Sequence, residues 1–239
     1  MGSQSENKIL FVFEGKKTEP NIHKKLEEYF FDGRTIITCV FGTVIYAIYK
    51  EIYDDPDLDI FTLLRHKITG LKNFTRDDFS EIYLFFDYDS QATNYREHKL
   101  NQLLQIFDNE TENGKLYISY PMVEALKHYR SGTEFQLLTA RCSENYKKEV
   151  NQYCEEKYKD FNQYDENIWK ELIKFHLYKM NYIVTAEYSY PSKIYSQIDI
   201  FNKQKKKFID KENKVSVLSA FPIFIHDYFG NEKTKKIVE

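Results

Sequence analysis

Acidic residues follow three apolar segments of this sequence, at positions where they could bind a metal ion. The segments read KILFVF, EIYLFF and KLYISY, and the acids that follow them are Glu14, then Asp87 and Asp89, then Glu124. If the segments are parallel neighbours in one sheet, their carboxyl ends bring these carboxylates to one edge. Like charges that lie close together oppose one another's ionisation, and a divalent cation removes that cost. Because carboxylate oxygens are the ligands that Mg²⁺ or Mn²⁺ prefers, the sequence predicts such a site.

The spacing of Asp87 and Asp89 suits shared binding of one metal ion. Side chains alternate along an extended segment, so both aspartates are expected on one side and Tyr88 on the other. The plainer alternative is that acids after a strand are solvated loop residues or helix caps.

The segments that must position these acids alternate between strand and helix patterns. Strands are expected over 8–13, 35–41, 81–86 and 115–120, where short apolar, β-branched and aromatic runs occur. Helices are expected after Thr18, which can cap one ahead of Pro20, in two stretches around the acidic turn 54–57, over 94–107, and from Pro121 onward. This order predicts an α/β fold with a mostly parallel sheet flanked by helices.

The second half of the sequence has a different pattern. Apolar residues recur at helical spacing over 133–179, 191–203 and 215–229, and the lysine-rich segment 203–214 is expected to join the last two helices. The segment Ser131-Gly132-Thr133 is typical of a loop, which suggests a domain boundary near residue 131. We expect one domain over 1–131, with a helical insertion at 43–80, and a mainly helical region over 132–239.

Two motifs in the first half resemble a known family. FVFEGKKTEPNIHKKL, followed about 70 residues later by IYLFFDYDS, resembles the Toprim fold, the catalytic domain that topoisomerases, primases and a group of nucleases share. The form E-G-x-x-T-E-P resembles the RloB-like and OLD-like branch of Toprim nucleases, which act in bacterial defence against phage. The resemblance covers roughly residues 8–130 and implies a Toprim-like catalytic domain there. It leaves the C-terminal region unexplained.

The resemblance implies roles for individual acids. Glu14 matches the glutamate of the first strand, a metal ligand and general acid or base, and Asp87 and Asp89 match the metal-binding pair. Glu19 matches a second acid of OLD-like members, a ligand of a second metal. Glu124 resembles the acid of an N-P-x-x-E segment, although Tyr stands here in place of Asn. The implied activity is that of a Mg²⁺-dependent hydrolase, an endonuclease that cleaves the phosphodiester bonds of DNA or RNA as an antiphage effector.

Basic residues near these acids could hold a nucleic-acid backbone. Lys16 and Lys17 open a predicted helix, where backbone N–H groups also favour phosphate. Lys127, His128 and Arg130 follow Glu124 and could line the same cleft. The lysine-rich segment 203–214 could grip phosphates as well, or it could be a solvated loop.

Overall composition excludes a uniformly basic nucleic-acid-binding protein. The 239 residues include 34 basic and 37 acidic ones, for a net charge of −3, so binding would depend on local lysines or metal ions. The three cysteines show no metal-binding spacing. No apolar run approaches the roughly 18 residues of a membrane span, and MGSQSENK lacks the layout of a signal peptide. We expect a cytoplasmic protein that does not enter a membrane.

The expected partners are nucleic acid, a separate ATPase or sensor subunit, and a second copy of the chain. No GxxxxGK[ST] loop occurs, and OLD-type nucleases often work with an ATPase domain or subunit. The segment 51–59 carries five acids and no base, so it should face away from nucleic acid or toward a protein.

Two other functions remain open at this point. A DxD motif after a strand also chelates the metal of a nucleotide-sugar diphosphate, as in glycosyl- and nucleotidyltransferases, but this leaves Glu14, Gly15 and Glu19 unexplained. A Toprim-derived scaffold or binding module without catalysis is the other alternative, and retention of the acids counts against it.

Overall fold

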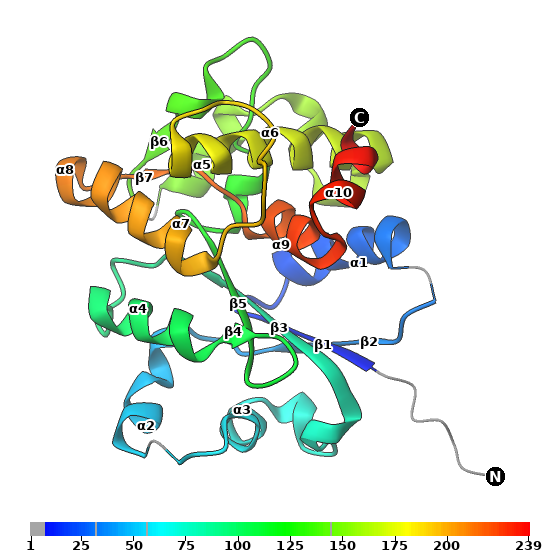
Figure 1. The fold of residues 1–239 in the computed structure, drawn as a ribbon, viewed down its shortest axis with the longest axis vertical. Coiled ribbons are helices and arrows are strands. Elements are labelled where there is room, and N and C mark those ends of the chain that lie inside the picture. The colour runs from blue at the N-terminus through cyan, green and yellow to red at the C-terminus, as the bar shows by residue number, and fades with distance from the viewer. Residues whose placement is uncertain (1–7, 32, 56, 144) are drawn as a thin grey trace. The chain divides into compact units, whose positions relative to one another are not determined.

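The structure, a computed structural model, describes residues 8–31, 33–55, 57–143 and 145–239. It shows an α/β protein with a mostly parallel five-stranded sheet and flanking helices, which confirms the expected fold class at this level (Figure 1). No helix within the described ranges is long and apolar enough to cross a bilayer. The segment 1–7, from which we argued against a signal peptide, and Pro56 of the acidic turn lie outside the described residues.

The sheet has the strand order β2–β1–β3–β5–β4. Its strands are β1 (Lys8–Phe13), β2 (Ile36–Val40), β3 (Phe79–Asp87), β4 (Asp108–Asn109) and β5 (Gly114–Ser119). β1 runs parallel to both β2 and β3, with Phe13 opposite Val40 and Phe85, whereas β4 and β5 form an antiparallel pair. Ile9 to Phe13 are completely buried, as expected for a strand that has a neighbour on each edge and is covered on both faces.

Contacts between residues divide the chain into two compact units, which we describe separately. The first unit contains the residues up to Phe86 and Ala92–Leu116, and the second contains Asp87–Gln91 and Tyr117–Glu239. This division does not coincide with the boundary that we expected near residue 131. The reason is that residues just after Leu116 pack with the C-terminal elements: Tyr117 Oη donates to Asp227 Oδ2 at 2.6 Å, and Tyr120 pairs through its backbone with Leu218.

The helices of the first unit follow the predicted order. The two helices expected around the acidic turn are present, each flanked by short 3₁₀ turns. The α-helices are α1 (Thr18–Phe30), α2 (Tyr49–Asp54), α3 (Ile60–Lys67) and α4 (Glu97–Ile106), and the 3₁₀ turns are Ile45–Ala47, Thr69–Leu71 and Arg76–Asp78.

Helices dominate the second unit, as predicted. They are α5 (Tyr146–Tyr153), α6 (Glu166–Thr185), α7 (Gln197–Gln204), α8 (Asp210–Glu212), α9 (Ala220–Phe229) and α10 (Asn231–Val238). The longest, α6, is capped by Asp165, whose side chain accepts from the Ile168 backbone nitrogen at 2.8 Å, and the fully buried residues of this helix include Trp169. A two-stranded antiparallel ladder of β6 (Thr139–Ala140) and β7 (Val215–Ser216) was not predicted, because two-residue strands leave no periodic pattern.

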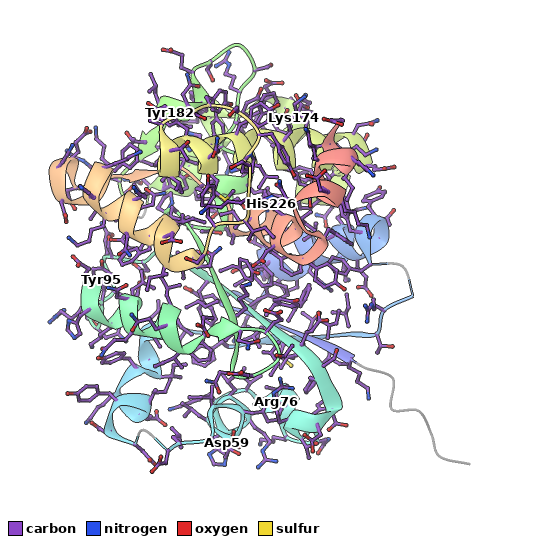
Figure 2. All side chains as sticks on the ribbon, in the orientation of Figure 1. Asp59, Arg76, Tyr95, Lys174, Tyr182 and His226 are labelled. Carbon is purple, nitrogen blue, oxygen red and sulfur yellow. The ribbon has the colours of Figure 1, made fainter. Side chains whose placement is uncertain are left out.

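Helix starts and ends differ from prediction at several positions. Thr18 does not cap α1; it is the first helical residue, and no side-chain cap bond occurs there. Asp59 does cap α3, accepting from the Phe61 backbone nitrogen at 3.1 Å (Figure 2). The helix expected after Pro121 is a 3₁₀ helix, Val123–Lys127. The expected loop 203–214 is largely helical, because a π turn, Lys205–Ile209, joins α7 to α8.

Gly114 offers a test of packing in the first unit. It is buried at the start of β5 with φ of +107°, and a Cβ atom there would lie 2.7 Å from Leu84 Cδ1 and 3.0 Å from Ile82 Cγ2. We expect Gly114→Ala to lower the free energy of unfolding in urea by about 2–4 kcal/mol, because backbone strain and overpacking add. Gly132→Ala is the matched control, since φ there is +73° with nothing within 4 Å of the new Cβ. Equal losses in both variants would contradict the packing argument.

Candidate functional site

The segment Asp87-Tyr88-Asp89 lies where the long buried strand β3 ends. Tyr88 is 2% exposed, and its ring lies 5.4 Å from that of Tyr120 and 6.3 Å from that of Phe201. Asp87 and Asp89 on either side of it are half-buried. This alternation follows the predicted pattern, with the aromatic ring directed into the core of the second unit and the two carboxylates less enclosed.

A network of backbone and side-chain bonds fixes the chain around Asp89. The Tyr88 backbone nitrogen donates to the Ser119 carbonyl oxygen at 2.9 Å, and the Tyr88 carbonyl oxygen accepts from Cys142 Sγ at 3.4 Å. Asp89 Oδ1 accepts from the Gln91 backbone nitrogen at 3.2 Å, so this carboxylate stabilises the turn that follows the strand. Both structural and chemical roles are therefore open to Asp89.

Glu124 and Lys147 form an ion pair that the sequence did not indicate. The Glu124 side chain is only 4% exposed, and its Oε1 lies 3.0 Å from Lys147 Nζ on α5. The Lys147 side chain is 60% exposed, so its ammonium group joins a buried carboxylate to the surface. Lys147 is one of two adjacent lysines in a polar helix, and nothing in the spacing distinguishes it. A metal ion bound to Glu124 would have to displace the Lys147 ammonium group or share the carboxylate with it.

Tyr146 and His128 lie next to these acids. Tyr146 is fully buried and its Oη lies 2.9 Å from His128 Nδ1. Burial raises the pKa of Tyr146 well above its ordinary value, and the charges of Glu124 and Asp87 raise this pKa further. The carboxylates of Glu124 and Asp87, both in the second unit, therefore both oppose ionisation of the Tyr146 hydroxyl.

His128 cannot contribute positive charge at neutral pH. Burial, followed by the charge of Lys179, lowers the pKa of His128 to about 4. The imidazole is 6% exposed and is neutral near pH 7, where it acts as a hydrogen-bond partner of Tyr146. The prediction that His128 lines a substrate cleft stays a prediction, and any contact it made with substrate at neutral pH would be through a neutral ring.

Lys127 also has a structural position. It is 4% exposed, its Nζ donates to Asn151 Oδ1 at 2.7 Å and to the Lys159 carbonyl oxygen at 3.2 Å, and it lies 4.9 Å from the centre of the Phe161 ring. Burial lowers its pKa. These partners hold the ammonium group inside the second unit and give Lys127 a structural role, while its role in substrate binding stays a prediction.

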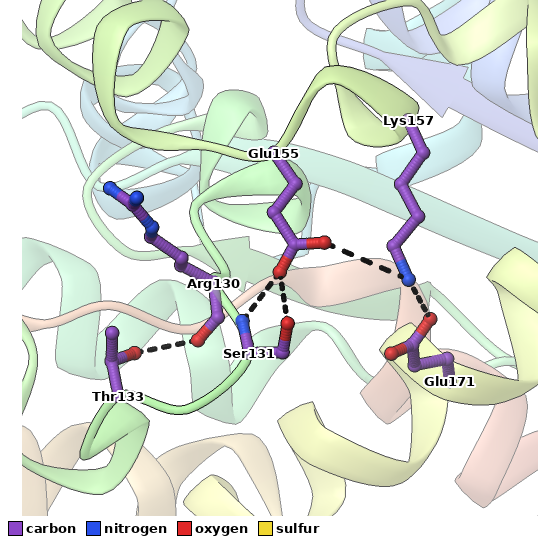
Figure 3. Close-up of polar contacts among 6 residues, drawn as sticks. All are labelled: Arg130, Ser131, Thr133, Glu155, Lys157 and Glu171. Atoms are coloured by element: carbon purple, nitrogen blue, oxygen red, sulfur yellow. Dashed lines mark hydrogen bonds and ion pairs between the residues drawn. The ribbon is translucent and has the colours of Figure 1, made fainter.

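Arg130 is exposed, and its backbone belongs to a tightly bonded turn. Its carbonyl oxygen accepts from Thr133 Oγ1 at 2.6 Å, while the backbone nitrogen and the hydroxyl of Ser131 both donate to Glu155 Oε1 (Figure 3). Lys157 bridges Glu155 and Glu171 at 3.9 and 2.7 Å. Of the three predicted substrate-binding residues Lys127, His128 and Arg130, Arg130 is therefore the exposed one.

In the first unit, Glu14 and Glu19 belong to the loop between β1 and α1. Glu14 follows β1 directly, and its backbone nitrogen donates to the Phe85 carbonyl oxygen at 3.1 Å. Glu19 is 6% exposed, and its Oε1 accepts from the Gly15 backbone nitrogen at 3.0 Å. A Cβ atom at Gly15 would lie 2.7 Å from Glu19 Oε2. The E-G-x-x-T-E spacing therefore has a local consequence, because a larger residue at position 15 would displace the Glu19 carboxylate from where it folds back onto the loop.

The lysines of the two basic segments differ in availability. Lys16 and Lys17 are exposed at the start of α1. In the C-terminal segment, Lys205 pairs with Asp210 at 2.7 Å, Lys214 pairs with Glu212 at 3.1 Å, and Lys207 Nζ donates to the Ile183 carbonyl oxygen at 2.6 Å. Half of that segment's lysines therefore stabilise the helices that carry them, while the exposed ones are Lys203, Lys206 and Lys211.

The predicted site residues fall in both units. Glu14, Glu19, Lys16 and Lys17 belong to the first, and Asp87, Asp89, Glu124, Lys127, His128 and Arg130 belong to the second. Within the described ranges, no group of three or more His, Cys, Asp and Glu side chains is arranged to hold a metal ion. The prediction of one metal centre that includes all the acids is therefore a proposal that needs experiment.

Comparison with known proteins found no relative of this chain. Neither the models of known families, nor the curated proteins, nor the solved structures include a match to this chain.

Proposed function

We propose that the protein is a metal-dependent nuclease that hydrolyses phosphodiester bonds with Mg²⁺ or Mn²⁺, as an effector of antiphage defence. The observation that carries this proposal is the pair of acids at the carboxyl ends of β1 and β3, which are parallel neighbours. Glu14 directly follows β1, and Asp87 is the last residue of β3. Ligand sites of open α/β sheets lie beyond the carboxyl ends of the strands, and acids there suit metal-assisted chemistry on phosphates.

The residues present suit a hard divalent cation. Carboxylate oxygens are its preferred donors, and Mg²⁺ is usually held by one or two carboxylates together with substrate phosphate oxygens and water. Half-buried Asp87 and Asp89 would supply those carboxylates, with Glu14 and Glu19 as the further acids that the sequence motif suggests. When bound, the ion would activate water and neutralise charge that develops on the phosphate.

The chain's own residues would bind the substrate and move the proton. Glu14 is the candidate to accept the proton of the attacking water. Lys147 positions the buried Glu124 carboxylate through their 3.0 Å contact and also presents positive charge to solvent, where a phosphate could approach. Lys16 and Lys17 are exposed at the start of α1, where the backbone N–H groups add to their attraction for phosphate.

A cleavage assay with three substrates tests the proposal. The purified full-length chain is incubated with supercoiled plasmid, single-stranded DNA or total RNA, in Mn²⁺, in Mg²⁺ or in EDTA. We expect cleavage of at least one substrate with Mn²⁺ or Mg²⁺ and none in EDTA, because the acids need the cation to approach phosphate. Intact substrates under every condition would contradict the proposal, and retention of nucleic acid without cleavage would favour a binding module. Separate addition of a candidate ATPase or sensor subunit tests whether a partner is required.

A further inference from the structure

The first unit contains a pocket that the proposed nuclease chemistry does not use. Its volume is about 570 Å³, and it lies between α2, the segment after it, and α4. Ile52, Leu58 and Ile106 give it an apolar wall. The polar and aromatic residues that line it include Tyr49, Tyr53, Asp55, Asp57, Gln102 and Gln105. The pocket therefore combines aromatic rings, carboxylates and side-chain amides.

The two tyrosines provide a flat surface for a cation. Their rings stack with centroids 5.9 Å apart and an interplanar angle of 20°. Tyr49 is 8% exposed, and the Lys99 ammonium group lies 5.3 Å from its ring centre, so this pair already accepts one cation. Tyr53 is 66% exposed, the largest exposure among the large hydrophobic residues of the described chain, and no described lysine or arginine lies over its ring. An exposed aromatic face of this kind favours a planar cation.

The acids of the pocket lack basic partners. Five acids and no base occur over 51–59. Glu51 pairs with Lys67 at 2.5 Å and Asp59 caps α3, which gives each of them a structural role. Within the described ranges, no ion pair involves Asp55 or Asp57; Asp55 Oδ1 only accepts from the Asp57 backbone nitrogen, at 3.2 Å. The rim of the pocket therefore carries uncompensated negative charge.

We propose that this pocket binds an arginine side chain presented by a basic segment of a partner protein. A guanidinium group is planar, stacks on tyrosine, and donates in pairs to carboxylates, so it matches Tyr53 and the two aspartates together. The side-chain oxygen of Gln105 can accept a further N–H group, and so can that of Gln102, which already accepts from Tyr49 Oη. A polypeptide is favoured over free arginine because the apolar wall extends the pocket beyond what one guanidinium fills. Nucleic acid is disfavoured, because the five acids repel phosphate.

A labelled peptide tests this assignment on the full-length protein. The probe is fluorescein-Gly-Leu-Arg-Leu-Gly-amide. The control peptide has citrulline in place of arginine, which keeps the shape of the side chain but removes its positive charge. We expect fluorescence anisotropy to show saturable binding below about 1 mM, weakened at least about tenfold by citrulline. Tyr53→Ala and Asp55→Asn/Asp57→Asn should each weaken binding by a similar factor.

Control measurements make the result decisive. Asp108→Asn/Glu149→Gln removes two exposed acids that do not line the pocket, so it changes the net charge equally and should leave binding unchanged. No saturable binding, equal binding of the citrulline peptide, or equal loss in the control variant would overturn the proposal. Displacement by free arginine as effective as by unlabelled peptide would overturn the polypeptide assignment. If light scattering shows a homodimer and Tyr53→Ala dissociates it, the occupant of the pocket is a second copy of the chain, which would overturn the assignment to a partner protein. All these outcomes are independent of nuclease activity.

Discussion

Asp87→Asn is expected to lower the rate of nucleic-acid cleavage by at least about a hundredfold while the protein stays folded. The substitution keeps the size of a half-buried side chain at the end of β3 and removes its negative charge. An amide oxygen is a much weaker ligand for a hard cation than a carboxylate, so the charge that the proposed chemistry needs is lost. The measurement is the single-turnover rate with Mn²⁺ on whichever substrate the wild type cleaves, alongside urea unfolding.

Glu81→Gln is the matched control for Asp87→Asn. Glu81 belongs to the same strand, is also half-buried, and accepts from Tyr83 Oη at 3.0 Å, a bond that glutamine can keep. It lies far along the strand from the carboxyl end, so its loss of charge should leave the cleavage rate within about twofold of wild type. A wild-type rate in Asp87→Asn, or an equal loss in both variants, would remove Asp87 from the chemistry.

Acidification from pH 8 to pH 5 is expected to destabilise the second unit strongly, because it contains buried neutral histidines. Burial lowers the pKa of His128 to about 4 and that of His176 to about 3, and it also lowers the pKa of His226. An unfolded histidine takes up its proton near pH 6.5, while these folded imidazoles stay neutral. The stability that these neutral histidines contribute is therefore fully present above pH 6.5 and is lost as the pH drops toward 4. His128 and His176 each account for about 2 kcal/mol at pH 5.

The environment of His176 explains its low pKa and provides a specific test. The ring is fully buried, with Nε2 3.1 Å from the Leu126 carbonyl oxygen and Nδ1 accepting from the Ser219 backbone nitrogen at 3.2 Å. After burial, the charge of Lys179 is among the effects that lower the pKa. Lys179 is itself completely buried, and its Nζ donates to the carbonyl oxygens of Phe135 and Leu138, both at 2.6 Å.

Urea unfolding of His176→Gln at pH 8 and pH 5 separates titration from packing. Glutamine can keep one donor and one acceptor but does not titrate, so the loss between the two pH values should shrink by about 2 kcal/mol even if the variant is less stable at pH 8. His66→Gln changes an exposed histidine and should leave the loss unchanged. A pH dependence in His176→Gln equal to that of the wild type would show that another group causes the acid sensitivity.

The central strands could be predicted from the sequence because a strand that is buried on both faces consists of a nearly continuous run of apolar residues. Segment 9–13 contains only apolar and aromatic residues, and the structure buries it completely, whereas in the edge strand β2 only Cys39 is buried. The acids that end these strands were identifiable for the same reason, since each interrupts an apolar run. Local signals at helix starts were less reliable: Asp59 caps α3 as its type suggests, whereas Thr18 lies one residue inside α1.

Side-chain environments set by distant contacts could not be predicted. The sequence suggested only that Lys127 could line a cleft beside Glu124, and nothing in it indicated the contacts of this lysine with Asn151 and the Lys159 carbonyl oxygen. The partner of Glu124 is Lys147, which is 23 positions away in sequence and has an unremarkable neighbour of the same type. The lysine-rich segment after α7 was expected to be a loop because it is polar. It is largely helical, and ion pairs between its own side chains, such as Lys205 with Asp210, stabilise the helical turns.

The repeated passage of the chain between its two compact units has a consequence for recombination. The chain leaves the first unit after Phe86, returns at Ala92 and leaves again after Leu116, so neither unit is a continuous stretch of the gene. A single crossover that exchanges C-terminal halves between two such genes would always divide one unit between two parents. A crossover between Gln91 and Tyr117 would also separate the segment Asp87–Gln91 from its hydrogen-bond partners Ser119 and Cys142. An exchange of this kind would therefore move parts of compact units rather than whole units.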